Sequence, residues 1–456
     1  MVADAKLRSA FDPTAFSSFR FLSRELDAGG RVTLRYALDG ELELIEEFDL
    51  PIARELSDSD RVRVEGLLSL LHWVAGVSYF KLAAPAHVRC ETPPPTPAVA
   101  ELLEALYSEG LGEFAYTNAL SELPRPRFPR VEIERSGSPV LPNALARVLV
   151  PVGGGKDSAV ALEIVRRSGA EIALFSIGDA PPIARTVTAA ELPHLLVRRR
   201  LDPKLAELNA AGALNGHIPI TAIVSCVAVL TAALNGFDAV AMANERSASA
   251  GNLRWDGIEV NHQFSKGLRA ERLLAAALAE IGAGVELFSV LRPASELAIA
   301  RAFARLERYH AAFTSCNALF RLDPALRAAS WCCDCPKCRF VFLALAPFSS
   351  PEQLRGIFGA DLLDDESQFE GFALLSATGG HKPFECVGEE QESLAAMRLI
   401  AADPRWAQHR VVRRLTAQVL PQHPAAAGDP AEVLALSDEH RVPGALMSDV
   451  RALLGA

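Results

Sequence analysis

A glycine loop between an apolar strand and a helix is the stretch of this chain best suited to chemistry. The loop is Gly153-Gly154-Gly155-Lys156-Asp157-Ser158; it follows the apolar run 148–152, and a helical pattern begins at Ala159. Glycines let a backbone approach an anion closely, and the free N–H groups and positive dipole of a helix N-terminus attract negative charge. The loop therefore predicts a phosphate site. The alternative is a glycine-rich turn that binds no ligand. Such a turn would not need the Lys-Asp-Ser run, so that run favours the phosphate site.

The spacing of the loop excludes two common phosphate-binding motifs. A Walker A loop needs glycine five residues before Gly155 and Ser or Thr after the lysine, but the chain has Val150 and Asp157 there. A dinucleotide fingerprint needs a third glycine three residues after Gly155, where the chain has Ser158.

The loop resembles the PP-loop of N-type ATP pyrophosphatases, Ser-Gly-Gly-x-Asp-Ser, with Gly153 at the position of the serine. This resemblance implies cleavage of ATP to AMP and pyrophosphate, with magnesium as a cofactor. It also implies that the amides of the three glycines hold the leaving pyrophosphate and that Ser158 contacts phosphate oxygens. Asp157 would help to hold magnesium, and Lys156 would neutralise developing charge.

A cysteine group near residue 335 has the spacing of metal ligands. Cys332, Cys335 and Cys338 form Cys-x-x-Cys-x-x-Cys, and Cys316 lies upstream. Four thiolates would close a tetrahedral zinc site. Cys316 is the preferred fourth ligand, because Cys333 is adjacent to Cys332 and would strain the geometry. Related PP-loop enzymes that make a nitrile on a deazaguanine precursor resemble this chain in that spacing. A set of reduced, half-buried thiols is the alternative.

The elements that must position these groups alternate between strand and helix. Such alternation predicts an α/β fold with a parallel, doubly wound sheet, in which ligands bind beyond the carboxyl ends of the strands. We expect strands at 148–152, 171–177, 239–243 and 285–288, and helices at 159–168, 221–234, 268–281 and 295–309.

Polar residues follow these predicted strands. Ser176 ends the second strand, and Asn244-Glu245-Arg246-Ser247 follows the third. We expect Ser176 to help bind the nucleotide and Asn244 and Arg246 to line the substrate site; a polar loop with a helix cap is the alternative. Glu245, His262 and Lys266 are candidates for proton transfer, although a lone His or Lys in a loop is more often solvated.

The regions on either side differ in pattern from the central part. Alternating residues at 31–38 and 41–48 around Asp39-Gly40 predict a hairpin, followed by helices at 62–74 and 98–109. We predict an α+β module at 1–140, a PP-loop ATP-binding domain ending in the cysteine cluster at 141–350, and a helical extension at 351–456. Within the extension, Gly379–Ser393 predicts either an arm reaching the site or a capped acidic helix start, and 421–430 predicts a mobile connection.

Length and composition set limits on function. The chain has 456 residues, half of them hydrophobic, and a formal net charge of −10. These values favour several domains with real cores and disfavour broad nucleic-acid binding. No stretch approaches the ~20 apolar residues of a membrane span, and the charged first residues do not resemble a signal peptide. We expect no nucleic-acid partner, no membrane association and a cytoplasmic location; self-association stays open.

Several motifs taken together resemble the MurL-type UDP-N-acetylmuramoyl-L-alanyl-L-glutamate epimerases. The resemblance covers most of the chain and rests on the segments 71–81, 152–158, 215–221, 244–248, 331–339 and 384–390. It implies ATP-dependent inversion of the terminal L-glutamate of a UDP-linked muramoyl dipeptide, with release of AMP and diphosphate, in peptidoglycan precursor synthesis. In that case Lys156 and Asp157 serve adenylation, and Arg246, Arg254 or Arg269 bind substrate carboxylates or diphosphate.

Two other classes remain open on sequence alone. Another PP-loop ligase would use ammonia or sulfur to attack the same adenylate, giving an amidated, nitrile or thiolated product. A regulatory protein would bind ATP without turning it over.

Overall fold

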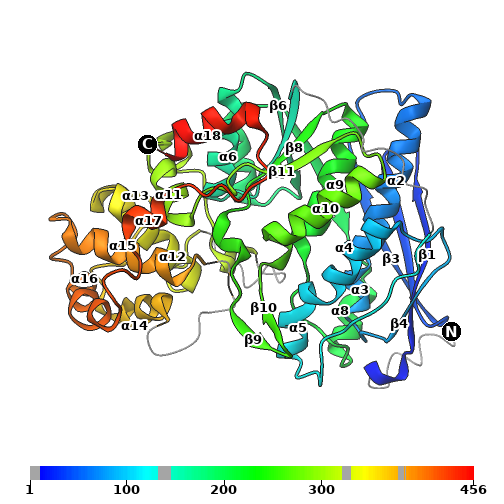
Figure 1. The fold of residues 1–456 in the computed structure, drawn as a ribbon, viewed down its shortest axis with the longest axis horizontal. Helices are drawn as coiled ribbons and strands as arrows, with labels where there is room; N and C mark the ends of the chain where they lie inside the picture. The colour runs from blue at the N-terminus through cyan, green and yellow to red at the C-terminus, as the bar shows by residue number, and fades with distance from the viewer. Residues whose placement is uncertain (1–10, 132–144, 321–329, 378–384, 386, 456) are drawn as a thin grey trace. The chain divides into compact units, whose positions relative to one another are not determined.

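The computed structural model describes residues 11–131, 145–320, 330–377, 385 and 387–455. The chain divides into two compact units, each assembled from separate segments and traced in Figure 1. Unit 1 comprises Met1–Leu149, Leu195–Val240 and Leu253–Leu287; unit 2 comprises Val150–His194, Ala241–Asn252 and Phe288–Ala456. The predicted range 1–140 falls in unit 1 and 351–456 in unit 2, whereas 141–350 contributes to both. The three-part division stays a prediction.

Unit 1 contains a strand run in the order β7-β3-β2-β1-β4, mostly antiparallel, with β4 parallel to β1. The helices that belong to this unit include two packed pairs, α2 with α9 and α4 with α10. The elements are β1 (Ser18–Leu26), β2 (Arg31–Leu38), β3 (Leu42–Asp49), α2 (Asp58–Ala75), α3 (Val77–Phe80), β4 (His87–Cys90), α4 (Pro97–Tyr107), α5 (Gly112–Thr117), β7 (His194–Arg200), α8 (Lys204–Ala210), α9 (Ile220–Asn235), β9 (Leu253–Trp255), β10 (Ile258–Val260) and α10 (Leu268–Glu280).

Local signals explain the first part of unit 1. The predicted hairpin is confirmed: β2 and β3 pair antiparallel, with Leu38 opposite Leu42, and Asp39 in the turn has a φ of 48°. The carboxylate of Asp39 accepts hydrogen bonds from the backbone of Ser17 and Ser18, which stabilises that conformation. The predicted helix that follows begins at a capping box, in which Ser57 and Asp60 satisfy each other's backbone N–H groups.

A second strand run, in the order β11-β8-β5-β6, provides the edge at which the glycine loop lies. The strands are β5 (Arg147–Pro151), β6 (Glu171–Ile177), β8 (Ala239–Met242) and β11 (Glu286–Ser289). β5 is parallel to β8, and the order reverses at β5, because β6 lies on one side and β8 and β11 on the other. Such a reversal is where ligands bind in α/β sheets. The α/β class is thus confirmed, whereas the PP-loop fold stays a proposal.

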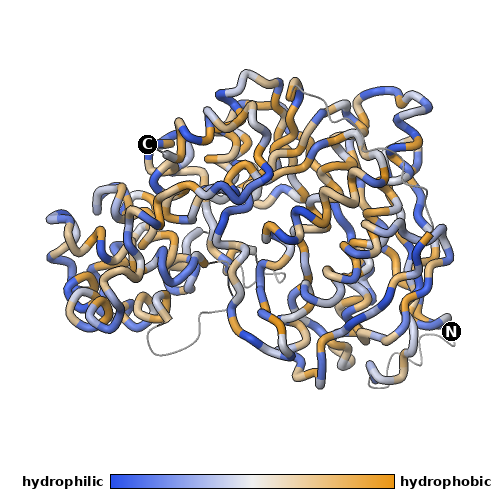
Figure 2. The backbone as a smooth tube through the Cα atoms, viewed as in Figure 1, coloured by the Kyte–Doolittle hydropathy of each residue, from blue (hydrophilic) through white to orange (hydrophobic). Residues whose placement is uncertain are grey.

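The apolar residues of these strands form a core. Val148, Leu149 and Val150 of β5 are fully buried, as is most of β8, and Figure 2 shows the strands of this region largely in the hydrophobic colours. A strand covered on both faces has no polar side, so it appears in the sequence as a continuous apolar run.

Unit 2 is otherwise mainly helical. Its helices are α6 (Lys156–Arg167), α7 (Pro181–Ala190), α11 (Glu296–Ala304), α12 (Pro336–Leu345), α13 (Pro351–Phe358), α14 (Phe369–Ala373), α15 (Glu390–Ala402), α16 (Arg410–Arg414), α17 (Pro430–Leu434) and α18 (Met447–Leu454). Three elements between the predicted strand 171–177 and the predicted helix 221–234 were not expected from the sequence: α7, β7 and α8. None of the helices in the part of the chain described is both long and apolar enough to cross a membrane.

The C-terminal segment 421–430, predicted to be mobile, is hydrogen-bonded to α15. Arg398 donates to the carbonyl oxygens of Pro424 and Ala427, and the Gly428 amide donates to Gln391. The predicted arm at Gly379–Ser393 falls largely outside the described residues up to 386; from Glu390 it is the first part of α15, with a capping box at Glu389.

Candidate active site

The glycine loop connects β5 to α6; its shape requires glycine at one position and leaves little room for a side chain at a second. Gly154 has a φ of +81°, and a Cβ there would lie 2.5 Å from Cβ of Pro182. A Cβ on Gly155, the N-cap of α6, would lie 2.8 Å from Oγ of Ser315. Gly153 has open space around it, so a serine fits there without a clash. The loop therefore presents backbone rather than side chains at the start of α6.

Lys156 is buried between two carboxylates. Its Nζ donates to Asp157 and to Glu296, the first residue of α11. The side chain of Lys156 is 1% exposed, whereas that of Asp157 is 28% exposed, so Asp157 is the member of the pair that a ligand can reach. Burial alone would lower the pKa of Lys156, but the negative charges of Asp157 and Glu296 outweigh burial and raise it. Lys156 is therefore a permanent cation.

Three carboxylates meet at this lysine. One oxygen from each of Asp157, Glu245 and Glu296 lies within 4.8 Å of the others. Burial, together with the charge of Glu296, raises the pKa of Asp157. Lys337 adds a second cation, with its Nζ 3.7 Å from Glu296. Oxygen ligands in such a cluster are those that magnesium prefers.

A fourth carboxyl group supports Glu296 from α15. Glu392 accepts a hydrogen bond from the Glu296 amide at 2.7 Å and another from the Glu389 amide at 2.6 Å. Burial, together with the charges of Glu296 and Glu389, raises the pKa of Glu392 to about 8. At neutral pH this group is mostly protonated, so it positions Glu296 without adding a full negative charge.

The other predicted residues of unit 2 have structural partners. Ser158 donates from Oγ to the Gly155 carbonyl at 3.0 Å, and Ser176 contacts His194, with 2.9 Å between Oγ and Nε2. Asn244 donates to Oγ of Ser289 at 3.0 Å. These contacts fix the side chains at the ends of β5, β6, β8 and β11.

Arg246 lies in a short 3-10 helix, η3 (Arg246–Ser249), and holds the C-terminal region. Its guanidinium donates to the carbonyl oxygens of Ala435 and Val433, at 3.0 and 3.1 Å. Arg292 is buried and donates to the Glu245 carbonyl at 2.5 Å, so it positions the backbone of that carboxylate.

The proton-transfer candidates His262 and Lys266 belong to unit 1. Nδ1 of His262 is hydrogen-bonded to Glu113 of α5, and the rings of His262 and His217 are 4.2 Å apart. Burial, with the neighbouring charge of His262, lowers the pKa of His217 to about 4, so that ring is neutral at pH 7. Lys266 ends η4 (Phe264–Lys266) and donates to Oε1 of Gln263 at 3.2 Å.

Two predicted substrate-binding arginines also belong to unit 1. Arg254 is an exposed residue of β9, opposite Glu259. Arg269 is 62% exposed and forms an ion pair with Glu109. The predicted site residues therefore divide between the units: the glycine loop, Ser176, Asn244, Glu245 and Arg246 in unit 2, and Arg254, His262, Lys266 and Arg269 in unit 1.

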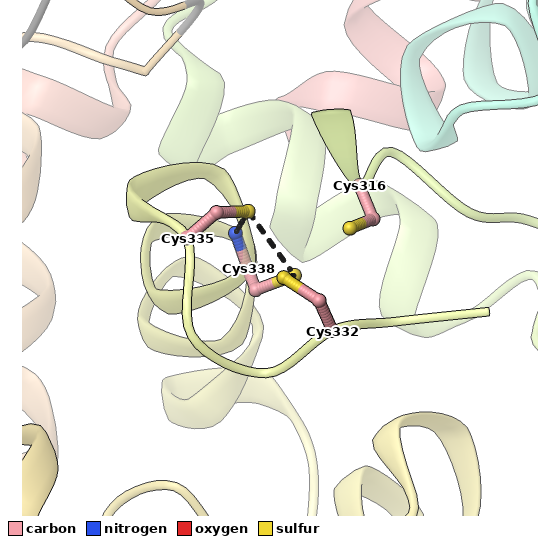
Figure 3. Close-up of side chains that lie close together, drawn as sticks. All are labelled: Cys316, Cys332, Cys335 and Cys338. Atoms are coloured by element: carbon pink, nitrogen blue, oxygen red, sulfur yellow. Dashed lines mark hydrogen bonds between the residues drawn. The ribbon is translucent and has the colours of Figure 1, made fainter. Parts of the chain in front are cut away.

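The cysteine cluster lies in unit 2, where the sulfur atoms of Cys316, Cys332, Cys335 and Cys338 point toward one another (Figure 3). All four sulfurs are within 4.8 Å of each other. Cys333 is not among them, since its sulfur lies 3.4 Å from the carbonyl of Phe358. Hydrogen bonds from Cys335 and Cys338 lower the pKa of the Cys316 thiol to about 3, which favours the thiolate.

Four residues of these clusters were not predicted as site residues. Glu296 and Lys337 contact the loop cluster, and Glu113 and His217 contact His262. His217 and Lys337 lie in segments that carry the family resemblance, 215–221 and 331–339. Glu296 could have been found from the sequence. It follows Ser295, the N-cap of the helix after β11, and the loop after β11 lies at the same edge of the sheet as the loops after β5, β6 and β8. Glu113 had no such signal, because it lies in a short helix among many surface acids.

The chain resembles two domain families and several curated proteins along nearly all of its length. Residues 10–290 match the MurL N-terminal domain, and residues 312–429 match the MurL C-terminal domain. Three relatives bear the name UDP-N-acetyl-alpha-D-muramoyl-L-alanyl-L-glutamate epimerase. The protein from a Micromonospora species is 47% identical over 435 residues, covering 93% of this chain and 96% of that protein. The Salinispora tropica protein is 48% identical over 405 residues, covering 87% and 88%.

The third relative, from Xanthomonas oryzae pv. oryzae, is 42% identical over 447 residues, covering 97% of this chain and 99% of that protein. Identity at this level over almost the whole length does not arise from a shared fold alone. The chain therefore belongs to the MurL family of UDP-N-acetyl-alpha-D-muramoyl-L-alanyl-L-glutamate epimerases.

Proposed function

We propose that this protein is an ATP-dependent epimerase of peptidoglycan precursor synthesis. It inverts the terminal L-glutamate of UDP-N-acetylmuramoyl-L-alanyl-L-glutamate to D-glutamate and produces AMP and diphosphate. The names of the relatives support the substrate and the inversion. The observation that carries the ATP dependence is the buried group of Lys156, Asp157, Glu245 and Glu296 at the glycine loop.

Inversion at the α-carbon of a free glutamate carboxylate is difficult for an electrostatic reason. Removing the α-proton would place a second negative charge beside the carboxylate. If the carboxylate first attacks the α-phosphorus of ATP, diphosphate leaves and a neutral acyl group bonded to AMP remains. Its α-proton can then be taken by a positioned base, while nearby donors stabilise the enolate oxygen. Return of a proton to the opposite face inverts the centre, and water then releases AMP from the acyl group.

The unit 2 cluster suits the first step. The loop amides at the start of α6 would hold the diphosphate, and Ser158 would contact phosphate oxygens. Asp157, Glu245 and Glu296 fit a magnesium ion, since three clustered carboxylates near Lys156 and Lys337 leave negative charge to neutralise. When bound there, magnesium would neutralise phosphate charge. Glu245 therefore suits cation binding better than the proton transfer first considered for it.

The unit 1 cluster suits the second step. His262, whose Nδ1 is hydrogen-bonded to Glu113, is the imidazole that would exchange a proton with substrate. The neutral ring of His217 adds no positive charge of its own when His262 gains a proton. Lys266 is the candidate for delivery of a proton to the opposite face.

Four charged or amide residues are proposed for substrate recognition. Asn244, Arg246, Arg254 and Arg269 stay candidates for binding the carboxylates and diphosphate of the substrate. The ion pair of Arg269 with Glu109 is exposed and therefore weak, so its guanidinium can exchange for a substrate carboxylate.

One incubation tests the proposal. Purified protein is mixed with ATP, magnesium and UDP-N-acetylmuramoyl-L-alanyl-L-glutamate; diphosphate is measured, and the chirality of glutamate is determined after acid hydrolysis. We expect both diphosphate and D-glutamate. Diphosphate without inversion, appearing only with ammonia or a sulfur donor, would instead identify another PP-loop ligase. Tight ATP binding with neither product would support a regulatory protein.

A further inference from the structure

The cysteine cluster of unit 2 and the glycine loop share their supporting segments. Cys316 follows Thr314, whose amide donates to the Gly154 carbonyl at 2.9 Å. It also follows Ser315, whose Oγ lies against Gly155. The position of Cys316 therefore sets where residues 314 and 315 support the loop.

The other side of the cluster also reaches the loop. Cys335 is the N-cap of α12 and accepts a hydrogen bond from the Cys338 amide at 3.4 Å. Between these two cysteines lies Lys337, whose ammonium group is 3.7 Å from Glu296, the partner of Lys156. A group that fixes Cys335 and Cys338 thus also fixes one of the cations beside the carboxylates.

The four sulfurs have the spacing of a mononuclear site. A tetrahedral zinc ion with Zn–S bonds of about 2.3 Å separates its sulfurs by about 3.8 Å. Sγ of Cys338 lies 3.8 Å from Sγ of Cys332 and 3.4 Å from Sγ of Cys335, and all four sulfurs are within 4.8 Å. These distances exceed a disulfide bond of ~2.05 Å, and all four cysteines are free thiols. Four thiolates with no water position describe a closed, structural site.

We propose that Cys316, Cys332, Cys335 and Cys338 bind one structural zinc ion, which holds the two segments that support the glycine loop. The zinc site stands independently of the enzymatic activity. The second part, that zinc loss weakens nucleotide binding, rests on the ATP binding proposed above.

Metal content tests the first part. Full-length protein produced with zinc in the medium is dialysed, and zinc and iron are measured by mass spectrometry. We expect one zinc per chain in the parent protein and in Cys333→Ser, whose cysteine lies in the same segment but outside the cluster. Cys316→Ser and Cys338→Ser should lose most of it. A parent protein without zinc, an iron-containing chromophore, or full zinc retention in both cluster variants would overturn the proposal.

The second part is tested on the parent protein, so it does not depend on variants that fail to fold. Zinc is removed with a thiol-blocking mercurial and a chelator, the block is reversed with dithiothreitol, and ATP affinity is measured by calorimetry before and after zinc is returned. We expect the affinity for ATP to fall by about tenfold or more when zinc is removed, because a buried charge such as that of Lys337 would be displaced from its partner. The affinity should recover when zinc is returned. Parent protein that binds ATP equally with and without zinc would overturn the coupling. Zinc-loaded protein that binds no ATP would refute the ATP proposal and, with it, the coupling, and would leave only the metal site standing.

Discussion

The two clusters of ionisable residues differ in charge density, and the difference indicates how each is used. In unit 2, Lys156 lies buried among carboxylates, and the charges outweigh burial to keep the lysine protonated. In unit 1, Glu113 is the carboxylate beside two histidines, and burial keeps His217 neutral. The first cluster holds a lysine that stays protonated among carboxylates, whereas the second contains imidazoles suited to exchanging protons.

This contrast predicts that the two chemical steps can be separated by mutation. If the carboxylates around Lys156 hold a metal ion and phosphates, as proposed, their loss should stop the reaction before the adenylate forms. A hydrogen-bonded histidine moves a proton, and its loss should leave the adenylate able to form. Single substitutions in each cluster test that separation.

Replacing Asp157 with Asn should abolish diphosphate release and inversion together. The side chain of Asp157 is the most accessible carboxylate of the unit 2 cluster, and its loss removes charge that a magnesium ion would need. We expect both rates to fall by roughly a thousandfold or more, as when a group stabilising developing charge is removed. Glu191→Gln, an exposed acid of unit 2, is the control. Diphosphate release at the parental rate in Asp157→Asn would contradict the role of this cluster.

Replacing His262 with Asn should reduce inversion while diphosphate release continues. Loss of a general acid–base group costs ~10²- to 10⁴-fold. Exchange of the substrate α-hydrogen with deuterated solvent, followed by mass spectrometry, measures the step directly, and diphosphate is measured in parallel.

Glu113→Gln tests the partner of His262 through a different observable. Because Glu113 acts through the imidazole, its loss should shift the acidic limb of the pH–rate profile of inversion downward as well as slow the reaction. Glu65→Gln, an exposed acid of the same unit, is the control. Equal losses of diphosphate release and inversion in both unit 1 variants would show that the clusters do not act separately.

Replacing Glu296 with Gln should destabilise the protein strongly, because it leaves Lys156 buried with one carboxylate partner fewer. Breaking a buried ion pair costs about 3–5 kcal/mol, whereas an exposed pair contributes about 0–1 kcal/mol. Urea denaturation followed by tryptophan fluorescence measures the free energy of unfolding. The matched control is Glu352→Gln, which removes an exposed pair with Arg355. Similar losses in both variants would contradict the distinction between buried and exposed charge.

The smallest effect concerns pH. The pKa of Glu392 is about 8 in the folded protein against a usual 4.5, so between these values the folded state holds a proton that the unfolded state has released. Stability should therefore fall as pH rises, by about 1 kcal/mol between pH 7 and 8. Glu392→Gln should flatten this alkaline slope in thermal unfolding, whatever its effect on absolute stability. An unchanged slope would show that Glu392 is ionised at neutral pH.

The histidines of unit 1 reverse this pH dependence. Burial lowers the pKa of His72 and of His217 to about 4, below the usual 6.5. The unfolded state binds protons first, so stability should fall as pH drops from 6.5 toward 4. Hydrogen exchange of α2 peptides should therefore report loosening on the acid side, and that of α15 peptides on the alkaline side.

Much of the secondary structure could be predicted because its causes are local. The 31–38 and 41–48 strands, the helix after Ser57 and strand 171–177 each carry their own periodicity, turn or cap within about a dozen residues. The elements missed between 178 and 210 have weaker patterns: α7 begins with two prolines, and β7 carries three arginines in succession. Those arginines lie in a strand because Arg199 and Arg200 form ion pairs with acidic residues of β3. The local sequence of β7 does not reveal that β3 is its neighbour.

The glycine loop, the helix that follows it, the cysteine spacing and the family of the chain could be predicted from local sequence. The distant groups that meet these features are set by the folding of the whole chain. Lys156 meets Glu296 across 140 residues, and His262 meets Glu113 across 149. The fold also brings Cys316 close to Cys332, Cys335 and Cys338. Periodicity and capping act within a few turns of chain, whereas the packing of strands and helices sets contacts between distant side chains.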